Sequence, residues 1–136
     1  MKKRGMKALV AVGVAAAAAA LVASPALAEG QWSSSITKAI TGFQSRTWQD
    51  NNNDNVSTTV TFGTCSTTPG TFSSTSLEMW GEFGLFPDQN LGTKTNYCGT
   101  SNWGDVANNA YHFRINKING STSGYWVWVG SVVTKY

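Results

Sequence analysis

Two glutamates at alternating positions are the residues of this chain best placed for acid–base chemistry. Glu78 and Glu82 flank Trp80 in the stretch EMWGE, and alternation along a strand would put all three side chains on one sheet face. A glycosidase uses paired carboxylates, and an aromatic ring can lie against a sugar. Carboxylates four residues apart on a strand lie about 13 Å apart, which is wide for either glycosidase geometry. We interpret the stretch as a solvated sheet face and predict no catalytic residue, with a glycosidase as an alternative.

The histidine and cysteine content also argues against catalysis. His112 is the only histidine, and it alternates with Tyr111 and Phe113 on a predicted strand. There a lone imidazole is more often a surface or hydrogen-bonded group than a general base. Cys65 and Cys98 lack the CxxC spacing of a redox pair, so in an exported protein they indicate one disulfide. One histidine and two paired cysteines cannot build a metal cluster, and we predict no metal and no cofactor.

Acidic and amide side chains gather in the stretch WQDNNNDNV, residues 48–56. Asp50, Asn52 and Asp54 match the first, third and fifth positions of a helix-flanked calcium loop. The match ends there, because the sixth position is Asn55 rather than Gly and the twelfth is Thr61 rather than Glu. Asn and Asp also favour tight turns by bonding to their own backbone. We interpret the stretch as a polar turn or hinge, with a cation site as the alternative.

The first 28 residues have the pattern of a secretory signal peptide. Four basic residues lie within positions 2–7, residues 8–22 are apolar, and residues 26–28 read Ala-Leu-Ala, a small-residue cleavage site. We therefore expect the mature chain to begin at Glu29 and to be secreted into the extracellular space, with no membrane contact after cleavage.

Cleavage changes the charge of the chain. The signal peptide holds four of the ten Lys and Arg residues and none of the seven Asp and Glu residues. The mature chain then carries a net charge of about −1 and has no basic surface for nucleic acid. We predict no nucleic-acid partner.

The mature sequence predicts one all-β domain. Apolar residues alternate with polar ones over residues 56–62, which lead into Cys65, over 77–85 and over 111–116, and no helical period is sustained. Asn119-Gly120 then predicts a hairpin, and residues 125–129 form its returning strand. This strand is apolar on both faces, so we expect it to be central in its sheet or to have one face covered by another segment. A last short strand segment follows at residues 131–134. The expected fold is a small antiparallel β-sandwich or partly closed barrel over residues 51–136, with one disulfide and an N-terminal arm.

The N-terminal arm, residues 29–50, has a different pattern. Its apolar residues recur at spacings of three and four, and they are Trp32, Ile36, Ile40 and Phe43. Three consecutive serines and Gly42 weaken any helix, which leaves a loose helix or an extended arm. An extended arm could add a strand to a partner and bury these side chains in its pockets. Alternatively, the arm folds back as the domain's own edge strand or short helix.

All six tryptophans fall in the mature chain, which is many for a domain of this size. Tryptophan is favoured for sugar stacking and as an interface anchor, although a small β fold can also bury several. For the same-face pair Trp126 and Trp128, inner packing and a recognition surface are both open. The candidate partner-binding residues are Trp32, Ile36, Ile40, Phe43 and Trp48 from the arm, with Trp80, Trp126 and Trp128 from the β domain.

The overall layout resembles a known group of secreted proteins. A signal peptide, an arm ending in SRTWQD (residues 45–50), a two-cysteine β domain and the stretch YHFRINKING (residues 111–120) are similar to small secreted β-proteins of filamentous actinobacteria. Among these, the chain resembles the adaptor subunit of umbrella toxin particles, which joins a lectin-bearing subunit to the large toxin-carrying stalk protein. The resemblance implies antagonism against competing bacteria, no enzymatic activity and an N-terminal strand inserted into a partner. It covers the layout of most of the mature chain, and no individual binding residue is matched.

From the residues and the resemblance together we predict a secreted, non-enzymatic adaptor that joins larger secreted subunits of an antibacterial toxin complex through its arm and β domain. The expected partners are the toxin-bearing stalk protein and the lectin-bearing subunit. A carbohydrate or cell-wall binding module that uses Trp80, Trp126 or Trp128 is one alternative, and a secreted hydrolase inhibitor is another.

Overall fold

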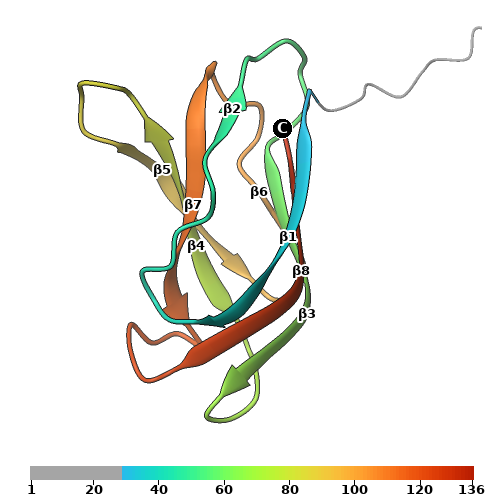
Figure 1. The fold of residues 1–136 in the computed structure, drawn as a ribbon, viewed down its shortest axis with the longest axis vertical. Helices are drawn as coiled ribbons and strands as arrows, with labels where there is room; N and C mark the ends of the chain where they lie inside the picture. The colour runs from blue at the N-terminus through green and yellow to red at the C-terminus, as the bar shows by residue number, and fades with distance from the viewer. Residues whose placement is uncertain (1–28) are drawn as a thin grey trace, which may run out of the picture.

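The computed structural model describes residues 29–136, and the predicted signal peptide, residues 1–28, lies outside this range. The described chain forms two four-stranded antiparallel sheets that face one another (Figure 1). Sheet A contains, in spatial order, β1 (Gln31–Ala39), β8 (Trp126–Lys135), β3 (Thr59–Thr68) and β6 (Thr100–Asn102). Sheet B contains β2 (Trp48–Asp50), β7 (Asn109–Ile118), β4 (Thr75–Glu82) and β5 (Gln89–Asn96). The predicted all-β sandwich is confirmed. Residues 29–136 include no helix long and apolar enough to cross a membrane.

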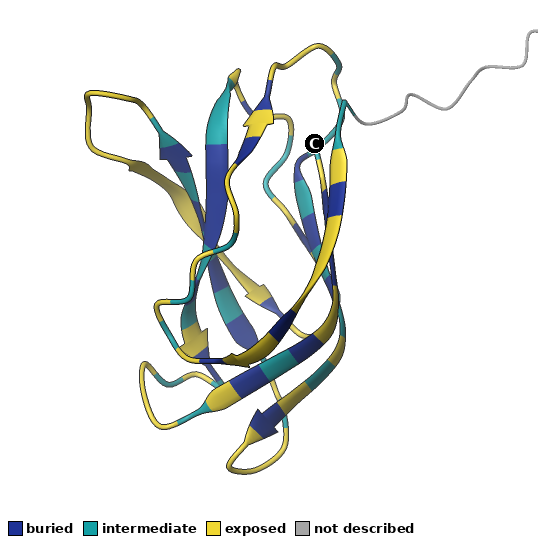
Figure 2. Cartoon of the chain, in the orientation of Figure 1, coloured by how far each residue is buried: buried dark blue, intermediate teal, exposed yellow. Residues whose placement is uncertain are grey.

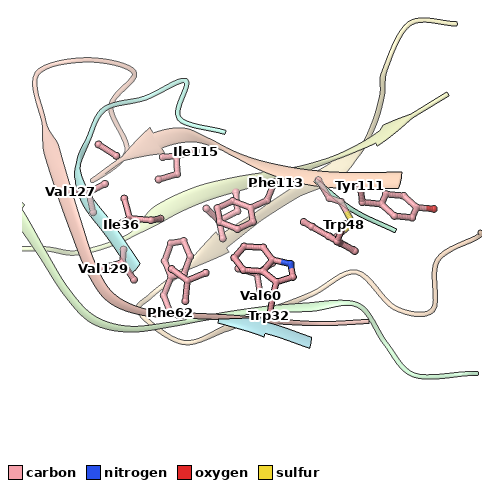
Figure 3. Packing of buried hydrophobic residues seen from close by; sticks show 14 of the residues in the cluster. Trp32, Ile36, Trp48, Val60, Phe62, Tyr111, Phe113, Ile115, Val127 and Val129 are labelled. Carbon is pink, nitrogen blue, oxygen red and sulfur yellow. The ribbon is translucent and has the colours of Figure 1, made fainter. Parts of the chain in front are cut away.

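Period-two alternation of apolar residues builds the inner faces of both sheets (Figure 2). Val60 and Phe62 in β3, Leu77 and Met79 in β4, and Phe113 in β7 are all at most 2 % exposed. In Figure 3 the inward side chains of the two sheets pack directly against one another. This contact between the sheets is the hydrophobic core of the described chain.

Two predicted strands have different ends in the structure. The first begins at Thr59 rather than Val56 and continues through Cys65 to Thr68. The second ends at Glu82, so the expectation that residues 83–85 continue it was wrong. Gly84 has φ +66°, and the Phe86 N–H donates to the Phe83 carbonyl at 3.3 Å, which closes a turn instead.

The predicted hairpin after Asn119-Gly120 was also wrong. Both turn residues have positive φ, as expected for this dipeptide, but only Ile118 and Ser121 bridge across the turn. The chain then crosses to sheet A, because β2 and β4 already occupy both edges of β7. The returning limb and the last segment form one strand, β8, that passes through Gly130. Its central position between β1 and β3 agrees with its apolar sequence.

The N-terminal arm lies within this fold. Residues 31–39 form edge strand β1 paired with β8, and residues 48–50 form β2 paired with β7. Of the arrangements left open for the arm, the structure has the one in which it docks on its own domain. The register shift between Ile36 and Ala39 marks a bulge in β1, whereas the shift between Ser34 and Ile36 places the extra residue in β8. Trp32 and Ile36 share the core face as residues four apart on a strand do, and the bulge in β1 turns Ala39 to the same face. Ile40 follows the end of β1 and is exposed, so the helix-like spacing does not mark one buried face of the arm.

The predicted disulfide is confirmed and ties the sheets together. Cys65 lies in β3, and Cys98 lies in the connection between β5 and β6, with 5.9 Å between their Cα atoms. A loop of this length stabilises the fold by about 4 kcal/mol on the chain-entropy model. The bond is also compatible with an extracellular protein.

Ile36 and Thr37 provide a matched test of whether β1 belongs to this domain in solution. Ile36 is 4 % exposed, and replacing it by Ala removes buried carbon and leaves a cavity. We expect Ile36→Ala to lower the free energy of unfolding by about 2–4 kcal/mol. Thr37→Ala, at the exposed neighbouring position, should change it by less than about 0.5 kcal/mol. Urea denaturation of residues 29–136 measures both, and negligible effects of both would mean that residues 31–39 leave the sheet in solution.

Candidate functional site

The polar stretch after β2 is a turn built around the side chain of Glu29. Glu29 accepts hydrogen bonds from the backbone N–H groups of Asn51 at 2.7 Å and Asn53 at 2.9 Å. Asp50 accepts from the Asn52 N–H at 2.8 Å, and Asp54 accepts from the Val56 N–H at 2.8 Å. The two aspartates therefore make the local backbone bonds that favour these residue types in turns.

The acidic side chains of this turn have opposite pKa shifts. The hydrogen bond from the Asn53 backbone N–H is the largest influence on Glu29 and, with Asn51, lowers its pKa below the ordinary 4.5. Burial raises the pKa of Asp50 above the ordinary 3.8, against the opposing effect of hydrogen bonds from Asn52 and Thr58. In residues 29–136 no three His, Cys, Asp or Glu side chains are grouped closely enough to hold a metal ion. The turn geometry alone accounts for the contacts of both aspartates.

The outer face of sheet B carries the two glutamates that the sequence placed together. Glu78 accepts a hydrogen bond of 3.0 Å from the Trp80 indole N–H. Glu82 is joined to His112 Nδ1 at 2.9 Å and accepts a second bond from the Thr47 hydroxyl at 2.8 Å. His112 is 6 % exposed, so it is a buried and hydrogen-bonded side chain of the kind expected.

This constellation consists of hydrogen bonds between neighbouring side chains. The Thr47 hydroxyl donates to the Glu82 carboxylate, which is also joined to the His112 imidazole. Each glutamate also bonds to a neighbouring side chain of the same sheet, and Trp80 is tied to Glu78. The arrangement is that of a hydrogen-bonded sheet face.

The eight candidate partner-binding residues are distributed over three environments. Trp32, Ile36 and Trp48 lie in the core at 9 %, 4 % and 3 % exposure. Phe43 is partly buried against the core and Ile40 is exposed. Trp80 is half-buried on the outer face of sheet B, while Trp128 is half-buried and Trp126 exposed on the outer face of sheet A. The structure therefore does not bring these residues together on one surface.

A different apolar surface lies at the tip of the β4–β5 hairpin, which projects from the sandwich in Figure 1. We call it the hairpin tip, and it consists of Phe83, Leu85, Phe86 and Leu91, which are 42 %, 103 %, 75 % and 39 % exposed. Sequence reasoning put Phe83 and Leu85 on a strand face and did not single out the other two. Gly84 and Pro87 interrupt the apolar run, and this interruption is the sequence feature from which a turn at the hairpin tip could have been predicted.

The base of this hairpin is fixed by polar contacts near the disulfide. Asn96, 1 % exposed, donates to the Gly99 carbonyl at 2.8 Å and to the Ser101 hydroxyl at 3.0 Å. The Trp103 indole N–H donates to the Gly92 carbonyl of β5 at 3.1 Å. These bonds hold β5 at a defined position relative to the disulfide-bonded segment.

Comparisons with known proteins do not assign this chain to a family. No protein-family model matches the chain, and neither the curated proteins nor the solved structures give a match. The surface chemistry of the described residues is therefore the basis for assigning a function.

The opposite pKa shifts of Glu29 and Asp50 predict opposite effects of neutralising them. Because the pKa of Glu29 is lowered, its carboxylate stabilises the fold above pH 4.5, and this contribution is lost as pH falls through the lower folded value. Because the pKa of Asp50 is raised, its contribution is present below pH 3.8 and is lost as pH rises through the folded value.

We therefore expect Glu29→Gln to be less stable than the unmodified chain at pH 7, with a deficit that shrinks below pH 4.5. Asp50→Asn should be more stable at pH 7, with a gain that disappears below pH 3.8. Urea denaturation between pH 3 and 7 measures both differences. Shifts of the two variants in the same direction would contradict the assignment of these contacts.

Proposed function

We propose that this chain is a secreted, non-catalytic adaptor that binds larger secreted proteins of an antibacterial toxin complex, with the hairpin tip as its main protein-binding surface. The single observation that carries the proposal is the exposure of four large apolar side chains on one projecting hairpin. Membership of a toxin complex is the finer part of the proposal. It depends on the resemblance to the umbrella particle adaptor, whose partners would be the stalk protein and the lectin-bearing subunit.

The exposure of the hairpin tip supports a protein partner. Single exposed apolar residues are common on soluble proteins, but contiguous apolar patches often mark interaction sites. Phe83, Leu85, Phe86 and Leu91 fall within nine positions of one hairpin, and Leu85 is fully exposed. A partner pocket that receives Leu85 and Phe86 would remove from water the two apolar side chains of the hairpin that are most exposed.

The contacts of the arm move the proposed interface away from it. Inserting residues 31–39 into a partner would remove Trp32 and Ile36 from the core and break the pairing of β1 with β8. Binding through the hairpin tip requires no loss of core packing or strand pairing, since its side chains are already exposed to solvent. The adaptor role is therefore proposed with the arm as part of the domain and the hairpin as the contact.

The contacts of the candidate acid–base residues support a non-catalytic role. Glu78 is held by Trp80, and Glu82 is held by His112 and Thr47. These contacts give each carboxylate a structural partner on the outer face of sheet B, as a non-catalytic sheet face would have.

Affinity purification of the tagged protein from its native culture supernatant, followed by mass spectrometry, tests the proposal. We expect larger secreted proteins to co-purify with the unmodified chain. The double variant Leu85→Asp/Phe86→Asp should lower their recovery by at least about 30-fold, because two anchors lost from a buried interface cost about 2 kcal/mol or more. Its unfolding midpoint should be unchanged, because both side chains are exposed.

Tyr97→Asp is the matched control, since Tyr97 is a 74 % exposed aromatic residue outside the hairpin tip. It should leave the recovered proteins unchanged. Equal recovery with the unmodified chain and the double variant would refute the hairpin as the contact. Recovery of the chain alone from the native supernatant would refute the adaptor function itself.

A further inference from the structure

A surface groove crosses the outer face of sheet A, on the opposite side of that sheet from the core. It has a volume of about 590 Å³, within the range of small-molecule binding sites. Ser35 and Thr37 of β1 line one side, Thr64 and Ser66 of β3 line the other, and Trp128 of β8 lies between them. The groove thus joins three strands that are far apart in the sequence.

Gly130 lets Thr64 lie close against the central strand in the lining of the groove. It belongs to the central strand β8, and the register of β3 with β8 puts Thr64 opposite it. A Cβ atom added at Gly130 would lie 3.0 Å from the Thr64 Cβ, so a larger residue would press against the groove wall. The absence of a side chain here leaves Trp128, two residues earlier on the same face, as the bulky side chain on this face of the central strand.

Thr64 has an unusual backbone for a β-branched residue. Its φ is +55°, in the left-handed region that such residues rarely adopt, and it lies within β3. A conformation of this kind costs about 1–3 kcal/mol and is concentrated at functional sites. The strain is therefore located in a residue that lines the groove.

The chemistry of the lining fits a neutral polyhydroxylated ligand. Apart from the Trp128 indole, the polar side chains that line the groove are those of Ser and Thr, and its lining includes no Asp, Glu, Lys or Arg side chain. Hydroxyls both donate and accept, as the hydroxyls of a sugar do. The indole of Trp128 offers an apolar face of the type that stacks on a pyranose ring, with a polar N–H at its edge.

Trp126 extends this surface along the strand. It lies about 7 Å from Trp128 on the same face, opposite Thr68 at the end of the groove. Trp126 is 41 % exposed, and the Lys38 ammonium lies 5.0 Å from its ring centroid. Two indoles in a row beside an open groove suit a chain of several sugars better than one enclosed monosaccharide.

We propose that the groove on the outer face of sheet A binds a neutral oligosaccharide, with Trp128 as the central stacking platform and Trp126 as a second one. This site is separate from the hairpin tip, which belongs to sheet B. The adaptor would then contact a glycan and a protein through different sheets.

Titration calorimetry of residues 29–136 with neutral hexasaccharides tests the proposal. The probes are hexamers of β-1,4-linked glucose, β-1,4-linked N-acetylglucosamine and α-1,4-linked glucose, with hexagalacturonate as an anionic comparison. We expect at least one neutral hexamer to bind and to quench tryptophan fluorescence, and hexagalacturonate to bind more weakly. Trp128→Ala should weaken binding by at least about tenfold, which corresponds to about 1.4 kcal/mol of lost stacking.

Three further variants make the result specific to the groove. Ser66→Tyr fills the groove opposite Trp128 and should abolish binding without removing a core residue, so it tests the site even if Trp128→Ala does not fold. Trp80→Ala removes a half-buried tryptophan from the outer face of sheet B and should leave the affinity unchanged. The hairpin variant Leu85→Asp/Phe86→Asp should also bind the sugar normally, which separates this site from the protein-binding one.

The proposal is overturned if no neutral hexamer binds, or if hexagalacturonate binds more tightly than all of them. It is equally overturned if Ser66→Tyr binds as well as the unmodified chain, or if Trp80→Ala loses binding to the same extent as Trp128→Ala.

Discussion

The packing of Trp32 between the two sheets is the contact on which the other features of this fold depend. Trp32 belongs to β1 of sheet A, yet its ring lies nearly parallel to that of Phe113 in sheet B, at 6.3 Å between centroids. Its centroid is also 6.1 Å from that of Trp48, which in turn lies 6.1 Å from Tyr136. Aromatic pairs of this kind contribute about 0.5–1.5 kcal/mol each beyond their buried area. With Trp32 in place, β1 covers one edge of β8 and supplies Ser35 and Thr37 to one side of the groove. An arm donated to another protein would lose both the core contact and this wall.

The parts of the fold that were predictable from the sequence are those governed by local alternation. Val60 and Phe62 in β3, and Phe113 in β7, face the core as their spacing indicates, and the two cysteines are paired. The arm was ambiguous because residues four apart, such as Trp32 and Ile36, share a face in a strand as they do in a helix, and because a bulge turns Ala39 to that face as well. The path of β8 could not be read from Asn119-Gly120, since that turn sets only the local direction of the chain. Which sheet receives β8 depends on which edges are free, and this is a tertiary property.

The candidate sites were less predictable than the fold. Trp126 and Trp128 were identified as a same-face pair, but the sequence could not show that this face points outward or that Gly130 and Thr64 line a groove beside it. The groove draws residues from positions 35–37, 64–68 and 128–130, which only the pairing of β1, β8 and β3 brings together. Glu78 and Glu82 were correctly placed on one face, and the bond of Glu78 to Trp80 lies within β4, whereas the contact of Glu82 with His112 required the register of β4 with β7.

The energetics of the β4–β5 hairpin explain why its apolar tip can be presented at a fixed place. In β5 every residue except Asn96 is exposed, so the strand gains little from hydrophobic burial, and a two-stranded ribbon alone is marginally stable in water. Its order therefore depends on its base, where Asn96 is fully bonded and Cys98 is joined to β3 of the other sheet. Since β3 also carries Thr64 and Ser66, the same disulfide-bonded strand supports the hairpin and one wall of the groove. One covalent link thus anchors both proposed binding surfaces, although their side chains come from different sheets. That arrangement suits a small domain that holds two ligands at a constant separation, as an adaptor must.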